Sequence, residues 1–184
     1  MIGKIENIIE GCRRKDRESQ KLLYEMFSAS MFGVCLRYAG SRDDAQDILH
    51  EGFLKIFEKI GQFESRGSFE GWIRRIMVNT ALERYRSLHK SVTLNEEIAE
   101  SENNISAEMN DSITVKELMS MIRELTPQYR LVFNLYAIEG YSHKEISKML
   151  NISEGTSKSN LSRARSILQE KVKEYYKQEI KVEY

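Results

Sequence analysis

The chain has 184 residues, of which 41% are hydrophobic and 30% are charged, and its formal net charge is zero. This balance is typical of a soluble globular protein and excludes a largely disordered chain. No run approaches the roughly 18 apolar residues of a membrane span, and the first twenty residues contain no apolar signal core. We therefore expect a cytoplasmic protein without membrane insertion. One proline and ten glycines are too few for a β-sandwich or barrel, so an all-α fold is favoured.

Cysteine and histidine usage predicts neither a disulfide framework nor a metal site. We expect Cys12 and Cys35 to be reduced, and His50, His89 and His143 lie far apart without partners at metal-ligand spacing. The chain contains no nucleophile elbow, no phosphate-binding loop and no HExxH motif. An enzyme is therefore the weakest functional class, and we expect no catalytic residue, no metal, no cofactor and no small-molecule substrate.

The neutral total hides an uneven distribution of charge. Residues 1–88 contain 15 basic and 13 acidic side chains, residues 89–112 contain one and six, and residues 113–184 contain 12 and nine. The middle stretch has few large apolar residues, so burial cannot offset the entropy lost on ordering it. We expect two mildly basic blocks joined by a flexible acidic linker.

Capping residues mark where the helices start. Ser41 and Ser68 precede acidic first turns, Thr126 precedes a proline, Ser142 begins a capping box and Ser153 precedes the last helix. With the apolar periodicity, these signals predict helices over residues 4–14, 16–39, 42–60, 69–88, 113–124, 127–138, 143–150 and 154–177.

The helix expected over 42–60 has an apolar face and, opposite it, an acidic stripe interrupted by one leucine. The apolar face consists of Ala45, Ile48, Leu49, Gly52, Phe53, Ile56, Phe57 and Ile60. The stripe consists of Asp47, Glu51, Leu54 and Glu58. Such a stripe is typical of a docking face for a basic partner helix. Single exposed leucines are also common, so an ordinary solvated face is equally compatible with the pattern.

One side of the helix expected over 69–88 combines an aromatic ring, an amide and guanidinium groups. These residues are Trp72, Arg75, Asn79 and Arg86. Guanidinium groups bind phosphate, while rings and amides contact exposed bases. The preceding loop, 61–68, has glycines and polar groups that can surround a flipped base. The alternative is that Trp72 belongs to the core and the arginines form a solvated face.

The C-terminal block has the pattern of a helix-turn-helix motif, in which a capped helix, a turn at 151–153 and a long basic helix follow one another. Gly140 and Asn151 stand at helix ends, where a left-handed residue is needed. The inward face of the long helix is expected to contain Leu161, Ala164, Leu168, Val172 and Tyr175. The outward face is expected to contain Lys158, Ser162, Arg165 and Gln169, with Ser159 and Arg163 beside it. Such residues contact base edges and phosphates, although an ordinary helical hairpin gives the same pattern.

Two parts of the sequence, in order, resemble the sigma factors of bacterial RNA polymerase in the extracytoplasmic-function (ECF) group. Residues 43–57 (DDAQDILHEGFLKIF) are similar to region 2.2 and residues 67–79 (GSFEGWIRRIMVN) to regions 2.3 and 2.4. Residues 125–130 (LTPQYR) through 154–165 (EGTSKSNLSRAR) are similar to region 4. The resemblance implies two small helical domains, with region 2 over 1–89, an acidic linker over 90–112 and region 4 over 113–184.

The resemblance also implies a function and a role for each surface. The chain would bind core RNA polymerase and direct promoter-specific transcription initiation, and an anti-sigma factor would control it. Contacts with the clamp helices of the largest subunit would come from Asp47, Glu51, Leu54 and Glu58, and the flap of the second-largest subunit is a further partner. Recognition and opening of the promoter −10 element would involve Phe63, Trp72, Arg75, Asn79 and Arg86. Recognition of the −35 element in the major groove would involve Thr156, Lys158, Ser159, Asn160, Ser162, Arg163 and Arg165.

The chain departs from the family pattern at Ser157 and Asn160, where many members have valine and arginine. It also lacks the aspartate that is common in the family after the position of Asn79, and Glu83 is the nearest acidic residue. Two other functional classes remain open. A conventional helix-turn-helix regulator would bind duplex DNA alone, usually as a dimer on symmetric half-sites. A bundle that only binds proteins would have no role on DNA.

Overall fold

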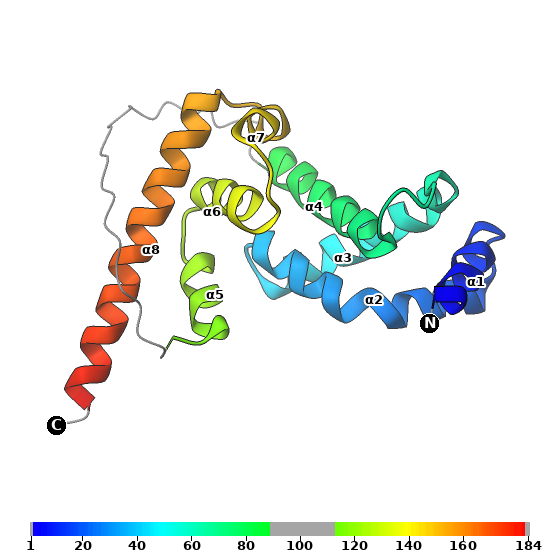
Figure 1. The fold of residues 1–184 in the computed structure, drawn as a ribbon, viewed down its shortest axis with the longest axis horizontal. Coiled ribbons are helices and arrows are strands. Elements are labelled where there is room, and N and C mark those ends of the chain that lie inside the picture. The colour runs from blue at the N-terminus through cyan, green and yellow to red at the C-terminus, as the bar shows by residue number, and fades with distance from the viewer. Residues whose placement is uncertain (1, 89–112, 183–184) are drawn as a thin grey trace. The chain divides into compact units, whose positions relative to one another are not determined.

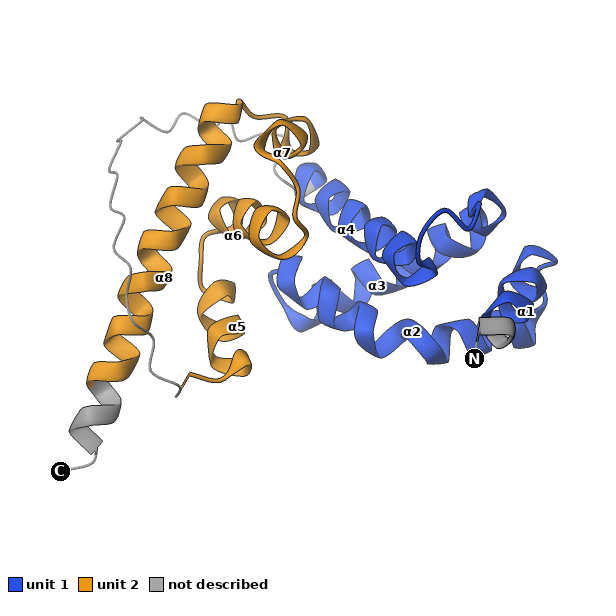
Figure 2. Ribbon diagram, viewed as in Figure 1, with its two compact units in different colours: residues 1–91 blue, residues 92–184 orange. Residues whose placement is uncertain are grey.

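The computed structural model describes residues 2–88 and 113–182 (Figure 1). Throughout these two ranges the regular structure is helical and contains no strand, which confirms the expected all-α class. The chain divides into two compact units, Met1–Ser91 and Val92–Tyr184 (Figure 2). The predicted flexible linker over 90–112 lies outside the described residues. None of the described helices combines the length and apolar character needed to span a bilayer.

Unit 1 is a bundle of three long helices with a shorter helix on one end. Its elements are α1 (Ile2–Arg13), α2 (Arg17–Tyr38), α3 (Arg42–Lys59), the 3₁₀ turn η1 (Ile60–Gln62) and α4 (Phe69–Leu88). Helices α2, α3 and α4 all pack on one another, while α1 packs on α2 and on η1. The predicted helices 42–60 and 69–88 are thus confirmed within one or two residues at their ends.

The apolar face predicted for α3 forms the centre of the unit 1 core. Its buried members are Ala45, Ile48, Leu49, Gly52, Phe53, Ile56 and, just beyond the helix, Ile60. Phe57 is only partly buried. Helix α4 contributes the fully buried Ile73 and Met77 to the same core. Each fully buried aliphatic side chain of this size stabilises the fold by about 1.5–3 kcal/mol, so this face orients α3.

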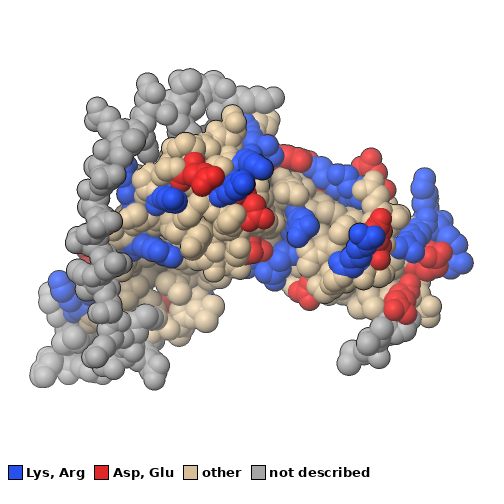
Figure 3. Space-filling model, turned by 45° about the horizontal axis from the view of Figure 1, so that its top comes forward, with Lys and Arg blue, Asp and Glu red and all other residues tan. Residues whose placement is uncertain are grey.

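Helices α1 and α2 form a tight hairpin because Gly11 lets the start of α2 approach closely. A Cβ atom at Gly11 would lie 2.0 Å from Ser19 Oγ and 2.6 Å from Ser19 Cβ. Asp16 is the N-cap of α2, and its carboxylate accepts hydrogen bonds from the Ser19 N–H at 2.9 Å and hydroxyl at 2.6 Å. Lys15 completes the turn in the left-handed region, with φ 60°. Lys and Arg side chains lie together with Asp and Glu side chains at this end of unit 1 (Figure 3).

The described part of unit 2, residues 113–182, contains four α-helices. They are α5 (Val115–Arg123), α6 (Pro127–Phe133), which continues into the π-helical turn η2 (Asn134–Ile138), α7 (His143–Leu150) and α8 (Glu154–Val182). The predicted capping box of Ser142 and Glu145 is present. Thr114 and Glu117 form a second capping box that the sequence reasoning did not identify. Thr126 is the N-cap of α6 but makes no side-chain capping bond, and Pro127 occupies the start of the helix, where a missing N–H costs no helical hydrogen bond.

The inward face of α8 holds unit 2 together. Leu161, Ala164 and Leu168 are buried as predicted, and Ala164 and Leu168 pack with Ile122 and Leu125 from the α5 segment. Farther along α8 the predicted core position Tyr175 is only half-buried, and its hydroxyl donates to Glu117 Oε1 at 2.7 Å. The C-terminal half of α8 therefore packs through polar as well as apolar groups.

Buried arginine links two helices of unit 2. Arg130 on α6 is 8% exposed, and its Nη1 donates to the backbone carbonyl of Arg123 at the end of α5 at 2.8 Å. The guanidinium thereby satisfies a helix-terminal carbonyl and fixes the angle between α5 and α6.

The close approach at Gly11 generates a stability prediction. Gly11→Ala forces a Cβ into Ser19, which cannot retreat without moving the α2 backbone, so we expect a loss of about 1–3 kcal/mol in the free energy of unfolding. Urea titration followed by circular dichroism measures it. Gly33→Ala is the matched control, because Gly33 is exposed within α2 with no atom near its Cβ position. That variant should gain up to about 1 kcal/mol from helix propensity. Equal stability of the two variants would contradict the prediction.

Candidate nucleic-acid interface

Helices α7 and α8 form the predicted helix-turn-helix motif. Asn151 ends α7 in the left-handed region, with φ 56° and ψ 48°, and Gly140 has φ 78° before α7 begins. Both positions therefore have the conformation that the sequence predicted. The Ser153 hydroxyl accepts from the backbone N–H of Thr156 at 2.9 Å and caps α8. The turn is thus defined by one left-handed residue and one cap.

The outward face of α8 is open to solvent where the sequence reasoning placed it. Lys158, Ser162 and Arg165 are exposed, as is Thr156 in the first turn. Two neighbours are half-buried and already bonded within the unit. The Ser159 hydroxyl donates to the Thr156 carbonyl at 3.0 Å, and Arg163 Nη1 donates to the Tyr129 hydroxyl at 3.2 Å.

Asn160 was expected to contact the −35 element, but it is only 6% exposed. Ser157 is fully buried as well. Both departures from the family pattern therefore lie on the inner side of α8. The physical reason is helical spacing, since positions 157 and 160 precede the buried Leu161 and Ala164 by four residues each. Extending the apolar periodicity of α8 backward by one turn would have identified both positions as buried.

A stack of three side chains lies beside the exposed face of α8. The rings of Tyr136 and His143 are stacked with centroids 4.7 Å apart, and the guanidinium of Arg165 lies over the Tyr136 ring at 5.7 Å. Across the motif, His143 Nδ1 and the buried Ser157 hydroxyl are 2.9 Å apart and share a hydrogen bond. Burial, with a smaller contribution from the Lys158 cation, holds the pKa of His143 below its ordinary value of 6.5. The sequence had no signal for this group, because its members come from three separate segments.

The candidate surface of α4 is only partly exposed. Arg75 and Asn79 are exposed, and Arg86 is exposed with its Nε donating to the Leu82 carbonyl at 3.3 Å. Trp72 is half-buried, so neither a fully solvated ring nor a core ring describes it. Arg75, Asn79 and Arg86 are therefore the accessible side chains of this surface, and the first two lie one turn apart.

Phe63 was expected to contact the −10 element, but the residue is only 7% exposed and its side chain packs inward. Its ring centroid lies 5.0 Å from that of Phe69 and 5.6 Å from that of Trp72. Aromatic rings in contact bury large apolar areas, and this explains why Phe63 turns inward. Phe63 supports the position of Trp72.

The loop that follows Phe63 has the backbone features predicted for residues 61–68. Residues 64–68 are exposed, with Ser65 at φ 58° and Gly67 at φ 99°. The Ser68 hydroxyl accepts from the Gly71 N–H at 3.0 Å and caps α4. At the other end of the loop, Arg13 Nη2 on α1 donates to the Phe63 carbonyl at 2.7 Å. The loop is therefore anchored at both ends and exposed between them.

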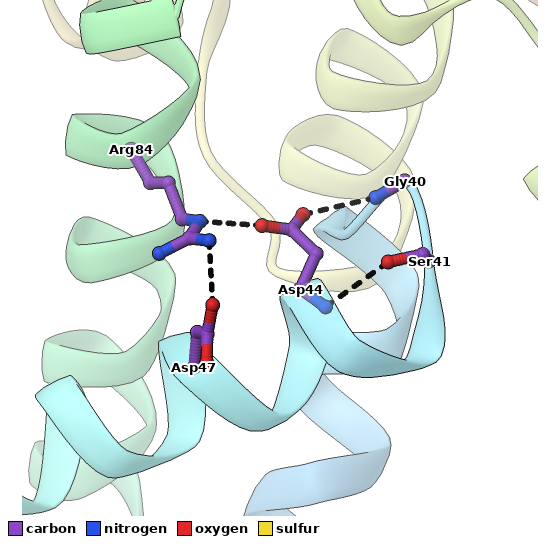
Figure 4. Close-up of polar contacts among 5 residues, drawn as sticks. All are labelled: Gly40, Ser41, Asp44, Asp47 and Arg84. Carbon is purple, nitrogen blue, oxygen red and sulfur yellow. Dashed lines mark hydrogen bonds and ion pairs between the residues drawn. The ribbon is translucent and has the colours of Figure 1, made fainter.

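The acidic stripe on α3 is exposed but partly paired. Leu54 is 70% exposed, the second most exposed of the large hydrophobic side chains recorded in the described chain. Asp47 Oδ2 accepts from Arg84 Nη2 on α4 at 2.8 Å, and the same guanidinium pairs with Asp44 through Nε (Figure 4). Glu51 lies 2.7 Å from Lys55 Nζ. The stripe was predicted from the sequence, but the pairing with Arg84 and Lys55 was not. These two cations lower the negative charge of the stripe and leave Leu54 exposed.

The remaining titratable groups of interest do not form a reactive site. Cys12 and Cys35 are both buried and free, and burial raises the pKa of the Cys12 thiol to about 11 and that of Cys35 to about 12. Such thiols stay protonated and are poor nucleophiles. In the ranges that the structure covers, no three His, Cys, Asp or Glu residues converge on a metal site.

The two units together define a DNA-recognition protein with a helix-turn-helix motif in one unit and a helical bundle in the other. Family comparison gives the identity of this class. The family model described as Sigma-70 region 2 matches residues 23–91, and the one described as Sigma-70, region 4 matches residues 116–168. The chain belongs to the Sigma-70 family, as a promoter-specific RNA polymerase sigma factor of the ECF group that acts in transcription initiation.

The relatives extend over nearly the whole chain. The ECF RNA polymerase sigma factor SigW of Bacillus subtilis is 26% identical over 182 residues, covering 92% of this chain and 97% of the relative. The ECF RNA polymerase sigma-E factor of Haemophilus influenzae is 27% identical over 178 residues, covering 90% and 93%. The sigma factor RpoE from Bartonella quintana, solved in complex with the anti-sigma factor NepR, has the same fold, with a TM-score of 0.51 and 22% identity over 83% of this chain and 96% of that one.

The His143–Ser157 contact generates a pH prediction. Because the pKa of His143 is lowered in the folded chain, the unfolded chain binds this proton more readily and folding stability falls as pH decreases through 6.5. We expect the urea midpoint of the full chain to fall between about pH 7.5 and about pH 5.5, and to fall less in His143→Gln. His50→Gln, on the exposed surface of α3, retains His143 and should retain the full decline. The same decline in all three proteins would refute the assignment.

Proposed function

We propose that this sigma factor divides promoter recognition between its two units, with unit 2 contacting the −35 duplex and unit 1 contacting the −10 element and core RNA polymerase. The observation that carries this proposal is that two exposed faces with cationic and other polar side chains lie on different compact units. One face, on α8, presents Lys158, Ser162 and Arg165, and the other, on α4, presents Arg75 and Asn79. Because these faces belong to different compact units, they can meet two DNA elements at once.

In unit 2, the N-terminal half of α8 enters the major groove. Lys158 and Arg165 bond phosphates or guanine edges, and Ser162 is small enough to let the helix approach the bases. Thr156, Ser159 and Arg163 flank this contact. The Tyr129 hydroxyl holds Arg163, and Tyr136 lies under Arg165, so both guanidinium groups are oriented before DNA arrives. The buried Asn160 does not contact DNA and instead helps to position α8 through its packing on the inner side of the helix.

In unit 1, Arg75, Asn79 and Arg86 bind the −10 element while the loop 64–68 takes an unstacked base. Trp72 offers its half-exposed ring to that base, supported from beneath by Phe63. Capturing an unpaired base lowers the free energy of the melted state relative to the duplex, so binding energy opens the strands. The chain therefore performs no catalysis of its own, since polymerisation belongs to the polymerase.

Core RNA polymerase is the partner of the acidic stripe. Leu54 supplies an apolar contact at the centre, and Asp47, Glu51 and Glu58 surround it with carboxylates that complement a basic partner helix, the clamp helices of the largest subunit. Unit 2 contacts the flap of the second-largest subunit. The complex of the RpoE relative with NepR supports an anti-sigma factor as a further partner. Because it works with RNA polymerase on promoter DNA, the chain acts in the cytoplasm.

The division of labour is tested by two paired substitutions in promoter-dependent transcription with core polymerase. We expect Lys158→Gln with Arg165→Gln to weaken binding to a duplex −35 fragment by about 1–3 kcal/mol per lost contact. We expect Arg75→Gln with Asn79→Ala to leave that binding intact and to reduce strand opening, measured by permanganate reactivity of thymines. Both pairs should lower promoter output about tenfold or more.

The outcome also separates the alternative classes. A conventional regulator would bind duplex sites tightly as a dimer without polymerase. A bundle that only binds proteins would show unchanged transcription in both pairs. Either result would reject the proposal.

The exposure of Leu54 yields a test of docking. Leu54→Ser removes an apolar group that is 70% exposed, so folding stability should change by no more than about 0.5 kcal/mol. Affinity for core polymerase should fall about 30-fold or more if this side chain is the central contact. Met26→Ser, which removes a 50% exposed apolar side chain from α2 of the same unit, is the control and should retain full affinity. Equal affinities of the two variants would rule out the docking role.

A further inference from the structure

The turn between α1 and α2 carries an unexplained cluster of cations. Arg13, Arg14, Lys15 and Arg17 are all exposed, and Asp16 is the only acid among them, so residues 13–17 have a net charge of +3. Arg13 pairs with Glu10 at 3.3 Å. The other three cations of this basic turn (residues 13–17) make no ion pair with any residue that the structure describes, although the charge of Arg14 helps to lower the pKa of the Asp16 carboxyl. Like charges this close together repel one another and lower the folding stability, so the cluster is not explained by a contribution to stability.

The basic turn is held in one conformation. The close contact of Gly11 with Ser19, the capping bonds of Asp16 and the left-handed backbone of Lys15 all constrain these five residues. The Asp16 carboxylate accepts both its bonds from Ser19, and these bonds lower its pKa, so it remains charged but directed into the helix start. The neighbouring cations are therefore displayed by a rigid support, which lowers the entropy lost on binding an anion.

The structure places the basic turn next to the exposed loop. Arg13 donates to the carbonyl of Phe63, the residue directly before residues 64–68, and α1 packs against η1, which leads into the same loop. In Figure 1 the chain between α3 and α4 lies beside α1 accordingly. Figure 3 shows Lys and Arg at this end of unit 1, with Asp and Glu beside them. Nothing in the family match accounts for the cluster, because the region 2 match begins only at residue 23.

We propose that the basic turn binds the phosphates of the separated DNA strand whose base occupies the loop 64–68. This inference rests on the proposed −10 role of unit 1 and extends it to α1. A DNA strand with one base in the loop must continue along the surface beside the loop. The hydrogen bond from Arg13 to the Phe63 carbonyl holds the basic turn next to that surface. Phosphates carry one charge per nucleotide, and several fixed cations bind such a chain without regard to sequence. The contact would hold the opened strand apart from its complement.

The test measures how tightly the holoenzyme binds a forked promoter whose −10 strand is already single-stranded. The variant carries Arg14→Gln, Lys15→Gln and Arg17→Gln, which leaves the Arg13 bond intact. Each lost phosphate contact removes about 0.7 from the slope of log affinity against log salt, so the slope should weaken by about 2. Affinity should fall about 10- to 100-fold at 0.1 M salt. Binding to a duplex −35 fragment should not change.

A second variant removes three exposed cations elsewhere. It carries Arg42→Gln, Lys173→Gln and Lys177→Gln and should retain the wild-type slope on the fork. Urea titration of both variants verifies that they fold, and surface changes of this kind alter stability by no more than about 0.5 kcal/mol each.

Each remaining outcome overturns one statement. If the turn variant keeps the wild-type salt slope while Arg75→Gln with Asn79→Ala loses fork binding, the turn has no phosphate role and the −10 assignment stands. If the turn variant loses affinity for core polymerase without DNA, the cations bind an acidic protein surface instead. If the wild-type holoenzyme binds the fork no better than a duplex of the same sequence, the proposed −10 function itself fails.

Discussion

Burial of one face of each long helix decides where the functional side chains point. In α3, the face from Ala45 to Ile56 packs against α2 and α4, and this forces Leu54 outward. In α8, burial of Leu161 and Ala164 directs Lys158 toward solvent. Rotation of either helix by half a turn would exchange core and surface residues at a cost of several kcal/mol, because each buried aliphatic side chain contributes about 1.5–3 kcal/mol. The surfaces proposed for recognition are therefore oriented by hydrophobic packing within each unit.

Polar contacts between helices then adjust the charge and the geometry of the exposed faces. Arg84 pairs with Asp44 and Asp47, so the acidic stripe is less negative than its sequence suggests. The half-exposed setting of these groups means that the pairs contribute little to stability, but they do constrain where the charges lie. In unit 2, the bond between His143 and the buried Ser157 ties α7 to α8 and fixes the angle of the motif. Both effects join segments far apart in sequence.

The two positions at which surface predictions differed from the structure share one cause. Phe63 and Asn160 were assigned to DNA contact, and both side chains are buried. Each sits next to a functional segment, so sequence proximity suggested exposure, whereas packing with Phe69 and Trp72 or with the inner side of α8 decided otherwise. Their buried positions suit them to supporting the exposed residues, because the side chains packed behind a binding residue often hold it in position.

The sequence by itself determined the local structure of this protein, because caps, left-handed residues and helical periodicity act over a few neighbouring residues. Helix starts at Ser41 and Ser142, the left-handed Asn151 and the buried face of α3 were all predictable in this way. Only the tertiary structure decided which distant groups meet, such as Arg13 with the carbonyl of Phe63 or Arg165 with Tyr136. Such contacts depend on how helices pack in three dimensions, and no short-range pattern in the chain encodes them.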